Sequence, residues 1–552
     1  MAYATVRPPR PRQAKGRNGV RVTESVRRAS DATVAPLRRV EAISSSYGAL
    51  LPLLGVAIMV GVWFYGGTAG WASGMFVTPV EAVQPIVESG GVYWRAAQAT
   101  MWSAFRGLVI GSTVAFIAAV IAAGVPALRR SITRLAAVAN AAPWVAVAPC
   151  LIILLGKSQG PTAVAAIAVF FAVFVSTVVG LGAAPASTHD VASVLGATRL
   201  RRVWSIQLPA AWPSVADGLK LAAPAALAGA VFGEWYGAPR GLGVLLITAM
   251  QSARPSQLWA ASLLSAAIGL VAYSTLAGFR GMLTSRFGST IAESGLSASR
   301  PKSLKVVAIE VVAVGALLAA FVSIWWLWIE LADIPGIVVP RPGAVFADIA
   351  ETPSLYLLAA GSTLVTAAAA LAIGAIVGLT AALAASRAKL LAGMSVPVVV
   401  ILAATPLVAL FPLLARVFGY QPNTVRLLAA VMVFYPVFVY TRSGLMAAQQ
   451  SSLDVLDSMG GSNSRRFRLV VLPSAVPHIA SGLRIAAGSS VIAAVVGETL
   501  IGRTGLGREF AYSFNVLQLP RAFGAALVIV VVSLAVFAAA GRFEQAIHRR
   551  WV

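Results

Sequence analysis

Reactive side chains are scarce in this chain of 552 residues. Its one cysteine, Cys150, excludes a disulfide framework and any metal site built from cysteines. The three histidines, His189, His478 and His548, are scattered along the chain. We find no histidines at metal-ligand spacing, no paired catalytic carboxylates and no nucleophile elbow. The sequence therefore predicts a protein that is not an enzyme and binds no metal.

A phosphate-binding P-loop is also missing. That pattern needs a glycine, four residues and then Gly-Lys-Ser/Thr, after a strand. Gly156-Lys157-Ser158 supplies only the last part, because Leu151 stands where the first glycine should be and a predicted membrane helix precedes it. We therefore predict that the chain cannot hydrolyse ATP and has no cofactor of its own.

Charged residues are few, at 11% of the chain, whereas hydrophobic residues make up 58%. A soluble protein of this length could not bury so much apolar surface. A membrane-spanning helix needs about 20 apolar residues, and only helices or closed barrels satisfy their backbone in lipid. The segments lack the alternation of barrel strands, and small residues such as Gly374 and Gly378 suit close helix packing. The predicted fold class is an all-α membrane protein with twelve spans, at about 48–67, 100–124, 133–156, 161–182, 212–233, 259–279, 306–329, 356–385, 391–415, 425–446, 476–497 and 522–541.

Basic residues set the predicted orientation. Most of the 43 Lys and Arg residues lie in the two tails and in the loops after even-numbered spans. By the positive-inside rule, both termini are then cytoplasmic. This topology accounts for the net charge of +24 without any nucleic acid. Residues 1–45 are predicted to be a disordered, basic cytoplasmic tail, and binding to nucleic acid or anionic lipid is the alternative for them.

The chain contains an internal repeat. An offset of 264 residues aligns the end of its first half with the end of its second half without a gap. The two halves are predicted to be homologous six-span domains at 46–282 and 306–552, joined by a polar cytoplasmic linker at 283–305. Because six is even, both halves enter the membrane in the same orientation. The matched residues include Asp190 with Asp454, Gly196 with Gly460, Arg201-Arg202 with Arg465-Arg466, Leu208-Pro209 with Leu472-Pro473, and Glu234 with Glu498.

The repeated basic segment resembles the coupling loop of the permease subunits of binding-protein-dependent ABC importers. That signature reads Glu-Ala-Ala, three residues, Gly, nine residues, an aliphatic residue, one residue and Leu-Pro. Both copies keep the full spacing, and both have Asp for Glu and Val for the first Ala; the second copy also has Leu456 for the second Ala. The corresponding residues are Asp190, Gly196 and Leu208-Pro209 in the first copy, and Asp454, Gly460 and Leu472-Pro473 in the second.

The resemblance implies that each loop docks on one of two ABC ATPase subunits, which bind ATP and Mg. A short helix is expected to end at the glycine, and the proline is expected to halt a second short helix before the next span. The aspartates would cap the loop or contact the ATPase. The paired arginines would meet its surface or lipid phosphates. The alternative is an ordinary basic cytoplasmic loop, which two copies in register disfavour.

Two further pairs of segments narrow the resemblance. GEWYGAPRGLG and GETLIGRTGLG follow the fifth span of each half, and FVTPVEAV and VVPRPGAV follow the first. They resemble the nitrate, sulfonate, taurine and pyrimidine-precursor branch of type I importers, although fused permeases also occur in iron and thiamine importers. The resemblance implies a tandem permease in the bacterial inner membrane that carries a small polar or anionic solute. An extracytoplasmic substrate-binding protein would deliver that solute, which the sequence does not identify.

The translocation path is expected between the halves. Pro143-Trp144 and Thr405-Pro406 interrupt equivalent helices. Asn140 is a polar residue inside an apolar run, and polar residues within spans are functional candidates. Hydrogen bonding between helices explains Asn140 equally well.

Glu234 and Glu498 are predicted near the outer face. There they could gate the path or touch the binding protein. A structural ion pair with Arg240 or Arg503, respectively, is the alternative.

Another class of protein also has twelve spans in two parallel halves. Major-facilitator secondary transporters are driven by ion gradients and use no ATP. They carry a Gly/Asp/Arg-rich signature between the second and third spans, where this chain has PALRRSITR. The most elaborate repeated loop lies two spans later, which favours the ABC permease.

Overall fold

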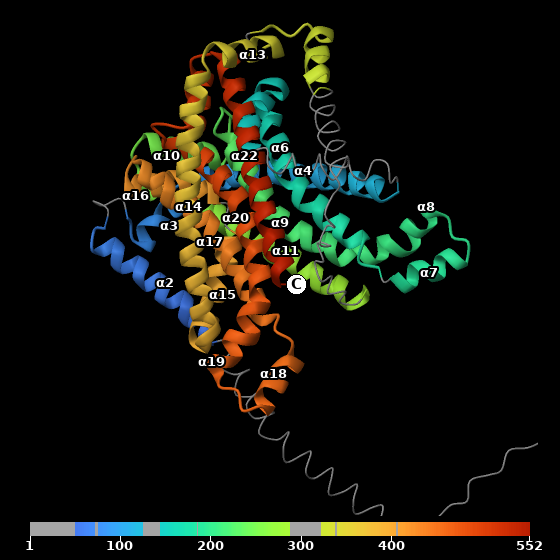
Figure 1. The fold of residues 1–552 in the computed structure, drawn as a ribbon. Coiled ribbons are helices and arrows are strands. Elements are labelled where there is room, and N and C mark those ends of the chain that lie inside the picture. Colours follow the sequence, from blue (N-terminus) through green and yellow to red (C-terminus); the bar gives the residue numbers. More distant parts are fainter. Residues whose placement is uncertain are drawn as a thin grey trace, which may run out of the picture.

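The computed structural model is helical, and no strand occurs among the residues it describes (Figure 1). These are residues 50–71, 76–124, 144–184, 186–287, 319, 322–336, 339–404 and 407–551. The predicted all-α fold class is confirmed. Some predicted features lie outside the described residues, namely the basic tail at 1–45, most of the linker at 283–305, and Asn140, Pro143, Thr405 and Pro406.

In the first half, long apolar helices alternate with short connecting ones. Trp144, a predicted path residue, begins α6. The elements are α2 (Leu50–Thr68), α3 (Pro79–Glu88), α4 (Gly90–Gly124), α6 (Trp144–Leu181), α7 (Ala186–Val194), α8 (Arg199–Arg202), the π-helix η1 (Val203–Gln207), α9 (Leu208–Glu234), α10 (Leu242–Gln251) and α11 (Pro255–Phe287).

The second half repeats this order. The offset of 264 that relates α10 to α21 also relates α7 to α18 and α11 to α22, so the repeat found in the sequence is a repeat of structure. The elements are α13 (Pro342–Glu351), α14 (Pro353–Arg387), α15 (Lys389–Ala404), α16 (Leu407–Phe418), α17 (Pro422–Met446), α18 (Gln450–Ser458), α19 (Asn463–Arg466), the π-helix η2 (Phe467–Val471), α20 (Leu472–Ile501), α21 (Leu506–Asn515) and α22 (Leu519–Trp551).

Eight helices of the described chain are long and apolar enough to cross a membrane, four in each half. They lie in α4, α6, α9 with its preceding turns, and α11, and in their counterparts α14, α17, α20 and α22. The twelve predicted spans are therefore not all confirmed. The apolar part of α2 is shorter, span 391–415 is divided between α15 and α16, and spans 133–156 and 306–329 are described only in part.

Small residues let the membrane helices approach closely. α6 packs on both α4 and α9, and its counterpart α17 packs on both α14 and α20. Gly374 and Gly378 of α14 lie against Val433 and Val437 of α17, where an added methyl group would be crowded. Their predicted role in close helix packing is confirmed.

The halves meet at a junction near the short helices. α2 packs on α15, while α9, α10 and α11 contact α16. Arg416 of α16 reaches across the junction and donates to the carbonyl oxygen of Met250 near the end of α10. A cation suits this position because the last carbonyls of a helix carry partial negative charge.

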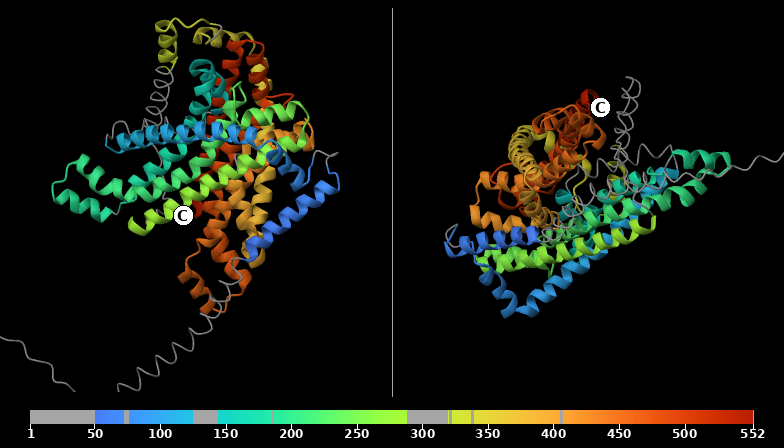
Figure 2. Two further views of the ribbon diagram at one scale, coloured as in Figure 1. Left: turned by 180° about the vertical axis from the view of Figure 1, so that it is seen from behind. Right: turned by 90° about the horizontal axis from the view of Figure 1, so that it is seen from below.

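The helix bundle of the first half crosses that of the second half instead of running parallel to it. Figures 1 and 2 show α7 and α8 on one side of the molecule and α18 and α19 on another. This arrangement differs from the predicted one, in which both loops face the same side. The halves also touch beyond the junction, because α6 contacts α20 and α22, and Val164 and Phe232 share a buried apolar cluster with Phe411 and Phe510.

Candidate functional site

The first candidate loop is a pair of short helices joined at a glycine. α7 ends at Val194, and Gly196 has a φ of 69°, which favours a residue without a side chain. The N–H of Ala197 donates to the carbonyl of Ala192 at 2.9 Å, as is usual where a glycine closes a helix. In the second loop Gly460 has a φ of 72°. Both glycines thus occupy the turns that the sequence predicts.

One arginine braces each loop internally. Arg202 Nη1 donates to Ser193 Oγ at 3.0 Å, and Arg466 Nη1 lies 3.2 Å from Asp457 Oδ2. Ser193 and Asp457 are equivalent positions in the repeat. Each of these contacts joins the two short helices of its loop. The second arginine of each pair is therefore engaged within the loop instead of facing only a partner or lipid.

The other residues of the signature lie on the surface of the loops. Asp190 and Asp454 are exposed, as are the first arginines, Arg201 and Arg465. Each loop also exposes apolar side chains at equivalent positions, Val191 with Val455 and Leu195 with Met459. Exposed apolar side chains of this size beside charged ones are typical of a docking surface.

The predicted stop at the proline is wrong. Leu208 and Pro209 begin α9, but the chain enters α9 from α8 through η1 without leaving the helical path. The N–H of Leu208 donates to the carbonyl of Val203, five residues earlier. Proline has no N–H and crowds the carbonyl four residues before it, and a π-turn widens the helix at that point.

The second loop repeats this turn in the same register. The N–H of Leu472 donates to the carbonyl of Phe467, and Pro473 follows in the first turn of α20. Each loop is therefore continuous with a long membrane helix, and a displacement of the loop will move that helix.

At the far end of α9, a glutamate ties three segments together. Glu234 Oε2 accepts from Thr100 Oγ1 of α4 at 3.0 Å and from the N–H of Gly243 at 2.8 Å. Thr100 Oγ1 also accepts from the N–H of Leu242 at 2.8 Å. These bonds secure the start of α10 to both α4 and α9. We call this set of residues the first glutamate clamp.

The second half has the same clamp. Glu498 Oε2 accepts from Thr363 Oγ1 at 2.8 Å and from the N–H of Gly507 at 3.1 Å. The N–H of Leu506 donates to Thr363 Oγ1 at 2.9 Å. This second glutamate clamp joins α14, α20 and α21.

The clamps explain the Gly-Leu-Gly segments. Gly241 and Gly505 have φ values of 151° and 101°, and a side chain at either would collide with the glutamate carboxylate. Glycine is needed because the backbone must pass directly over the carboxylate. The sequence therefore keeps a glutamate and a tight glycine turn together in both halves.

The expected roles of the two glutamates need correction. Glu234 is 1% exposed and Glu498 is 3% exposed, so neither side chain offers a surface to a binding protein. Among the described residues neither forms an ion pair, so the alternative with Arg240 or Arg503 is wrong. Each buried carboxyl group accepts two hydrogen bonds through Oε2, which offsets part of the cost of its burial.

Sequence reasoning missed the two threonines that complete the clamps. Thr100 and Thr363 are related by an offset of 263, which also relates Pro143 to Pro406. Following that offset further toward the start of each half would have paired them. Among the described residues, no group of three His, Cys, Asp or Glu side chains is placed to hold a metal ion.

Comparison with known proteins identifies the family. Residues 107–289 and 374–551 each match the profile of the binding-protein-dependent transport system inner membrane component. The chain belongs to this family. Because the profile matches twice, the chain is a tandem permease of an ABC importer, a membrane component without enzymatic activity.

Individual relatives agree with this assignment. A probable ABC transporter permease protein of Haemophilus influenzae is 31% identical over 221 residues, which cover 40% of the permease and 90% of the relative. The formylaminopyrimidine transport permease protein ThiX of Halalkalibacterium halodurans is 26% identical, over 36% of the permease and 80% of the relative. The taurine transport system permease protein TauC of Escherichia coli is 27% identical, over 34% and 72%. Each relative matches less than half of the permease, as a tandem duplication requires.

Proposed function

We propose that the permease supplies both transmembrane halves of one importer. Twelve spans in two halves would place the α7–α8 and α18–α19 loops on the cytoplasmic side, with both termini. Each loop would dock on one ATPase subunit, and these subunits would bind ATP and Mg. Members of this family work with an ATPase and a binding protein in general, and the particular arrangement here is our proposal.

The observation that carries the proposal is the matched exposure of apolar side chains on the two loops. Val191, Leu195, Val455 and Met459 are each more than half exposed. Burying one such side chain in a partner contributes about 1.5–3 kcal/mol. Residues at equivalent positions suit two equivalent partners, which is the arrangement that a pair of ATPase subunits would present.

The internal bracing supports a mechanical role for the loops. Because Arg202 and Arg466 tie the two short helices of each loop together, less of a push from the ATPase would be lost within the loop. The π-turns join the loops to α9 and α20 without a break. At the far ends of these helices, the glutamate clamps would pass the movement on to α10 and α21.

The proposal also requires the two bundles to align in the bilayer, because the loops now lie on different sides of the molecule (Figure 2). Single cysteines at Val194 and Ser458, in a background with Cys150 replaced by alanine, test this requirement. Both should react with an impermeant maleimide in inside-out vesicles and be protected in right-side-out vesicles. Opposite labelling of the two sites would refute the proposed topology.

The solute is proposed to be small and polar or anionic, delivered by a substrate-binding protein. This proposal is supported by relatives that are named as permeases for taurine, aliphatic sulfonates, nitrate and formylaminopyrimidine. Purifying the binding protein together with the permease and identifying its bound ligand by mass spectrometry would test the solute class.

Reconstituted transport tests the coupling. In proteoliposomes containing the permease, its ATPase and its binding protein, the paired variant Leu195→Asp with Met459→Asp should abolish ATP-dependent uptake. Val516→Asp, a change of the same kind at an exposed apolar residue outside the loops, should leave uptake intact. Uptake that persists without the ATPase and collapses with a protonophore would instead indicate the ion-gradient-driven alternative.

A further inference from the structure

One exposed arginine lies at the edge of the apolar part of α4. Arg106 is exposed, and residues 107–124 beyond it carry no charged side chain. At 1.5 Å per residue, this apolar stretch is about 27 Å long, close to the roughly 30 Å of a bilayer's hydrocarbon core. Arg106 is therefore placed where the hydrocarbon core meets the headgroup layer.

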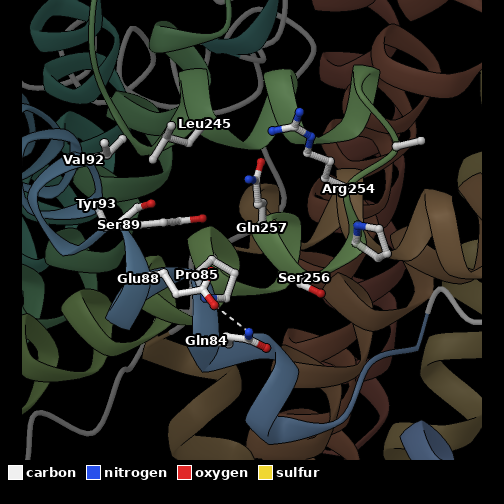
Figure 3. A pocket seen from close by; sticks show the side chains of 12 residues that line it. Gln84, Pro85, Glu88, Ser89, Val92, Tyr93, Leu245, Arg254, Ser256 and Gln257 are labelled. Carbon is white, nitrogen blue, oxygen red and sulfur yellow. Dashed lines mark hydrogen bonds between the residues drawn. The ribbon is translucent and has the colours of Figure 1, made fainter.

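The inward face of α4 fixes the direction in which Arg106 points. Tyr93, Thr100 and Ala104 are buried on that face. Figure 3 shows Tyr93 lining the same hollow as Leu245 of the neighbouring α10. Arg106 follows Ala104 by two residues, so it lies on the opposite side of the helix, away from the protein.

The guanidinium of Arg106 turns back toward the start of α4. Its Cζ lies 4.6 Å from the centroid of the Trp102 ring, and Trp102 is 54% exposed. Long basic side chains near a membrane boundary reach toward the headgroups in this way, and tryptophan is enriched at the same level. Within the described chain, the guanidinium has no hydrogen bond or ion pair. Its N–H groups are thus open to a partner outside the protein.

The second half has no such group on the equivalent face of α14. The offset of 263 that relates the two clamp threonines also pairs Trp102 with Val365 and Arg106 with Ala369. Val365 is 58% exposed, so this face is open in both halves. No charged residue occurs in α14 before Arg387 in its last turn. The face of α14 suits lipid chains alone, whereas α4 adds a cation and an indole ring at the level of the headgroups.

We infer that Arg106 and Trp102 bind the phosphate headgroup of an anionic phospholipid. A guanidinium donates two parallel hydrogen bonds to phosphate oxygens. The indole ring packs on the apolar part of the lipid and keeps its N–H toward the headgroup. A zwitterionic headgroup would bring a second positive charge beside Arg106, so an anionic lipid is preferred. The site is separate from the loops and the clamps, and the inference does not depend on the solute.

Native mass spectrometry of the full-length permease tests this site. The delipidated protein is titrated with phosphatidylglycerol, or with phosphatidylcholine that has the same acyl chains. The wild type should bind one phosphatidylglycerol more tightly than any phosphatidylcholine. Arg106→Gln should weaken that binding about fivefold, the effect of one arginine on an anionic lipid.

Arg95→Gln is the matched control on the same helix. Arg95 is also exposed and lies eleven residues before Arg106, which places it on the same face. It is about 16 Å further from the apolar stretch, beyond a headgroup layer of about 5–7 Å. Its replacement should change phosphatidylglycerol binding by less than about twofold.

A transplant to α14 decides the question even if Arg106→Gln does not fold. Val365→Trp with Ala369→Arg builds the same pair there and should add a second tightly bound phosphatidylglycerol. Equal binding by the wild type and Arg106→Gln would overturn the inference, as would equal affinity for the two lipids or no added lipid on the transplant. A photoreactive side chain at the exposed Val109 should crosslink to lipid in native membranes, and crosslinking to a protein would show that a subunit covers this face instead.

Discussion

Replacement of Glu544 by glutamine is expected to destabilise the permease by about 2–4 kcal/mol. Glu544 of α22 accepts from Arg484 Nη1 of α20 at 2.6 Å and from Ser481 Oγ at 2.6 Å. Its side chain is 6% exposed, while that of Arg484 is 28% exposed. Removing one member of a buried pair leaves the other charge uncompensated, which costs about 3–5 kcal/mol. The partial exposure of Arg484 lowers that figure.

The first half supplies the control, because an ion pair also joins the equivalent helices there, with its acidic residue at a different position on α9. There Asp217 of α9 lies 2.6 Å from Arg280 Nε of α11. In the repeat, Asp217 corresponds to Ser481 and Arg280 to Glu544. The side chains of Asp217 and Arg280 are 37% and 44% exposed, so Asp217→Asn should cost less than about 1 kcal/mol.

Unfolding in mixed micelles, followed by circular dichroism during titration with SDS, measures both effects. The double variant Arg484→Glu with Glu544→Arg should recover at least half of the stability lost in Glu544→Gln, because it restores opposite charges at the same two positions. Equal losses for Glu544→Gln and Asp217→Asn would refute the reasoning from burial. Failure of the exchanged pair to recover any stability would refute the role of the bridge.

Three further changes probe a clamp, a loop and the junction between the halves. Thr363→Val should cost about 1–3 kcal/mol, because it leaves the N–H of Leu506 and an oxygen of Glu498 without their partner; Thr363→Ser should be close to the wild type in the same titration. Gly460→Ala should cost about 1–2 kcal/mol, because alanine is strained at a φ of 72°, and faster proteolysis between α18 and α19 would report it. Arg416→Ala should weaken the junction between the halves, and increased proteolysis between α10 and α11 is the expected sign.

The sequence predicts the loops well because each boundary has a local chemical cause. A glycine with positive φ ends α7 and α18, and a hydroxyl residue precedes each following helix. These signals act over a few residues and need no tertiary information. The repeat then shows the same signal twice, since Gly196 and Gly460 stand at equivalent positions of the two halves.

The π-turns could not be read from the sequence in this way. A proline after a short helix usually indicates a stop, because it lacks an N–H and clashes with the preceding turn. Here Pro209 and Pro473 are accommodated by widening the helix by one residue just before them. Whether a helix stops or widens at a proline depends on the packing of both flanking segments, and α9 and α20 each pack on several other membrane helices.

The glutamate clamps could not be predicted from local sequence patterns, because they are formed by contacts between residues far apart in the sequence. Glu234 and Arg240 are six residues apart, so an ion pair is the simplest local interpretation of a glutamate beside an arginine. The actual partner, Thr100, is 134 residues away. Only the recurrence of the same threonine at the matching position in the second half points to it.

The duplicated chain separates what the two halves must do alike from what they are free to do differently. The loops, the π-turns and the clamps agree in register and in hydrogen bonding, as two equal partners that act together would demand. The differences lie elsewhere, in the positions of the ion pairs between the last two membrane helices and in the ion pair of Asp348 with Arg521, whose counterparts in the first half are Pro85 and Gln257. A solute that is not symmetric cannot use two identical surfaces equally. The end of each half that is remote from the loops is therefore the place where a difference between the halves would aid binding of the solute. A difference there would not disturb the coupling of the loops to the ATPase.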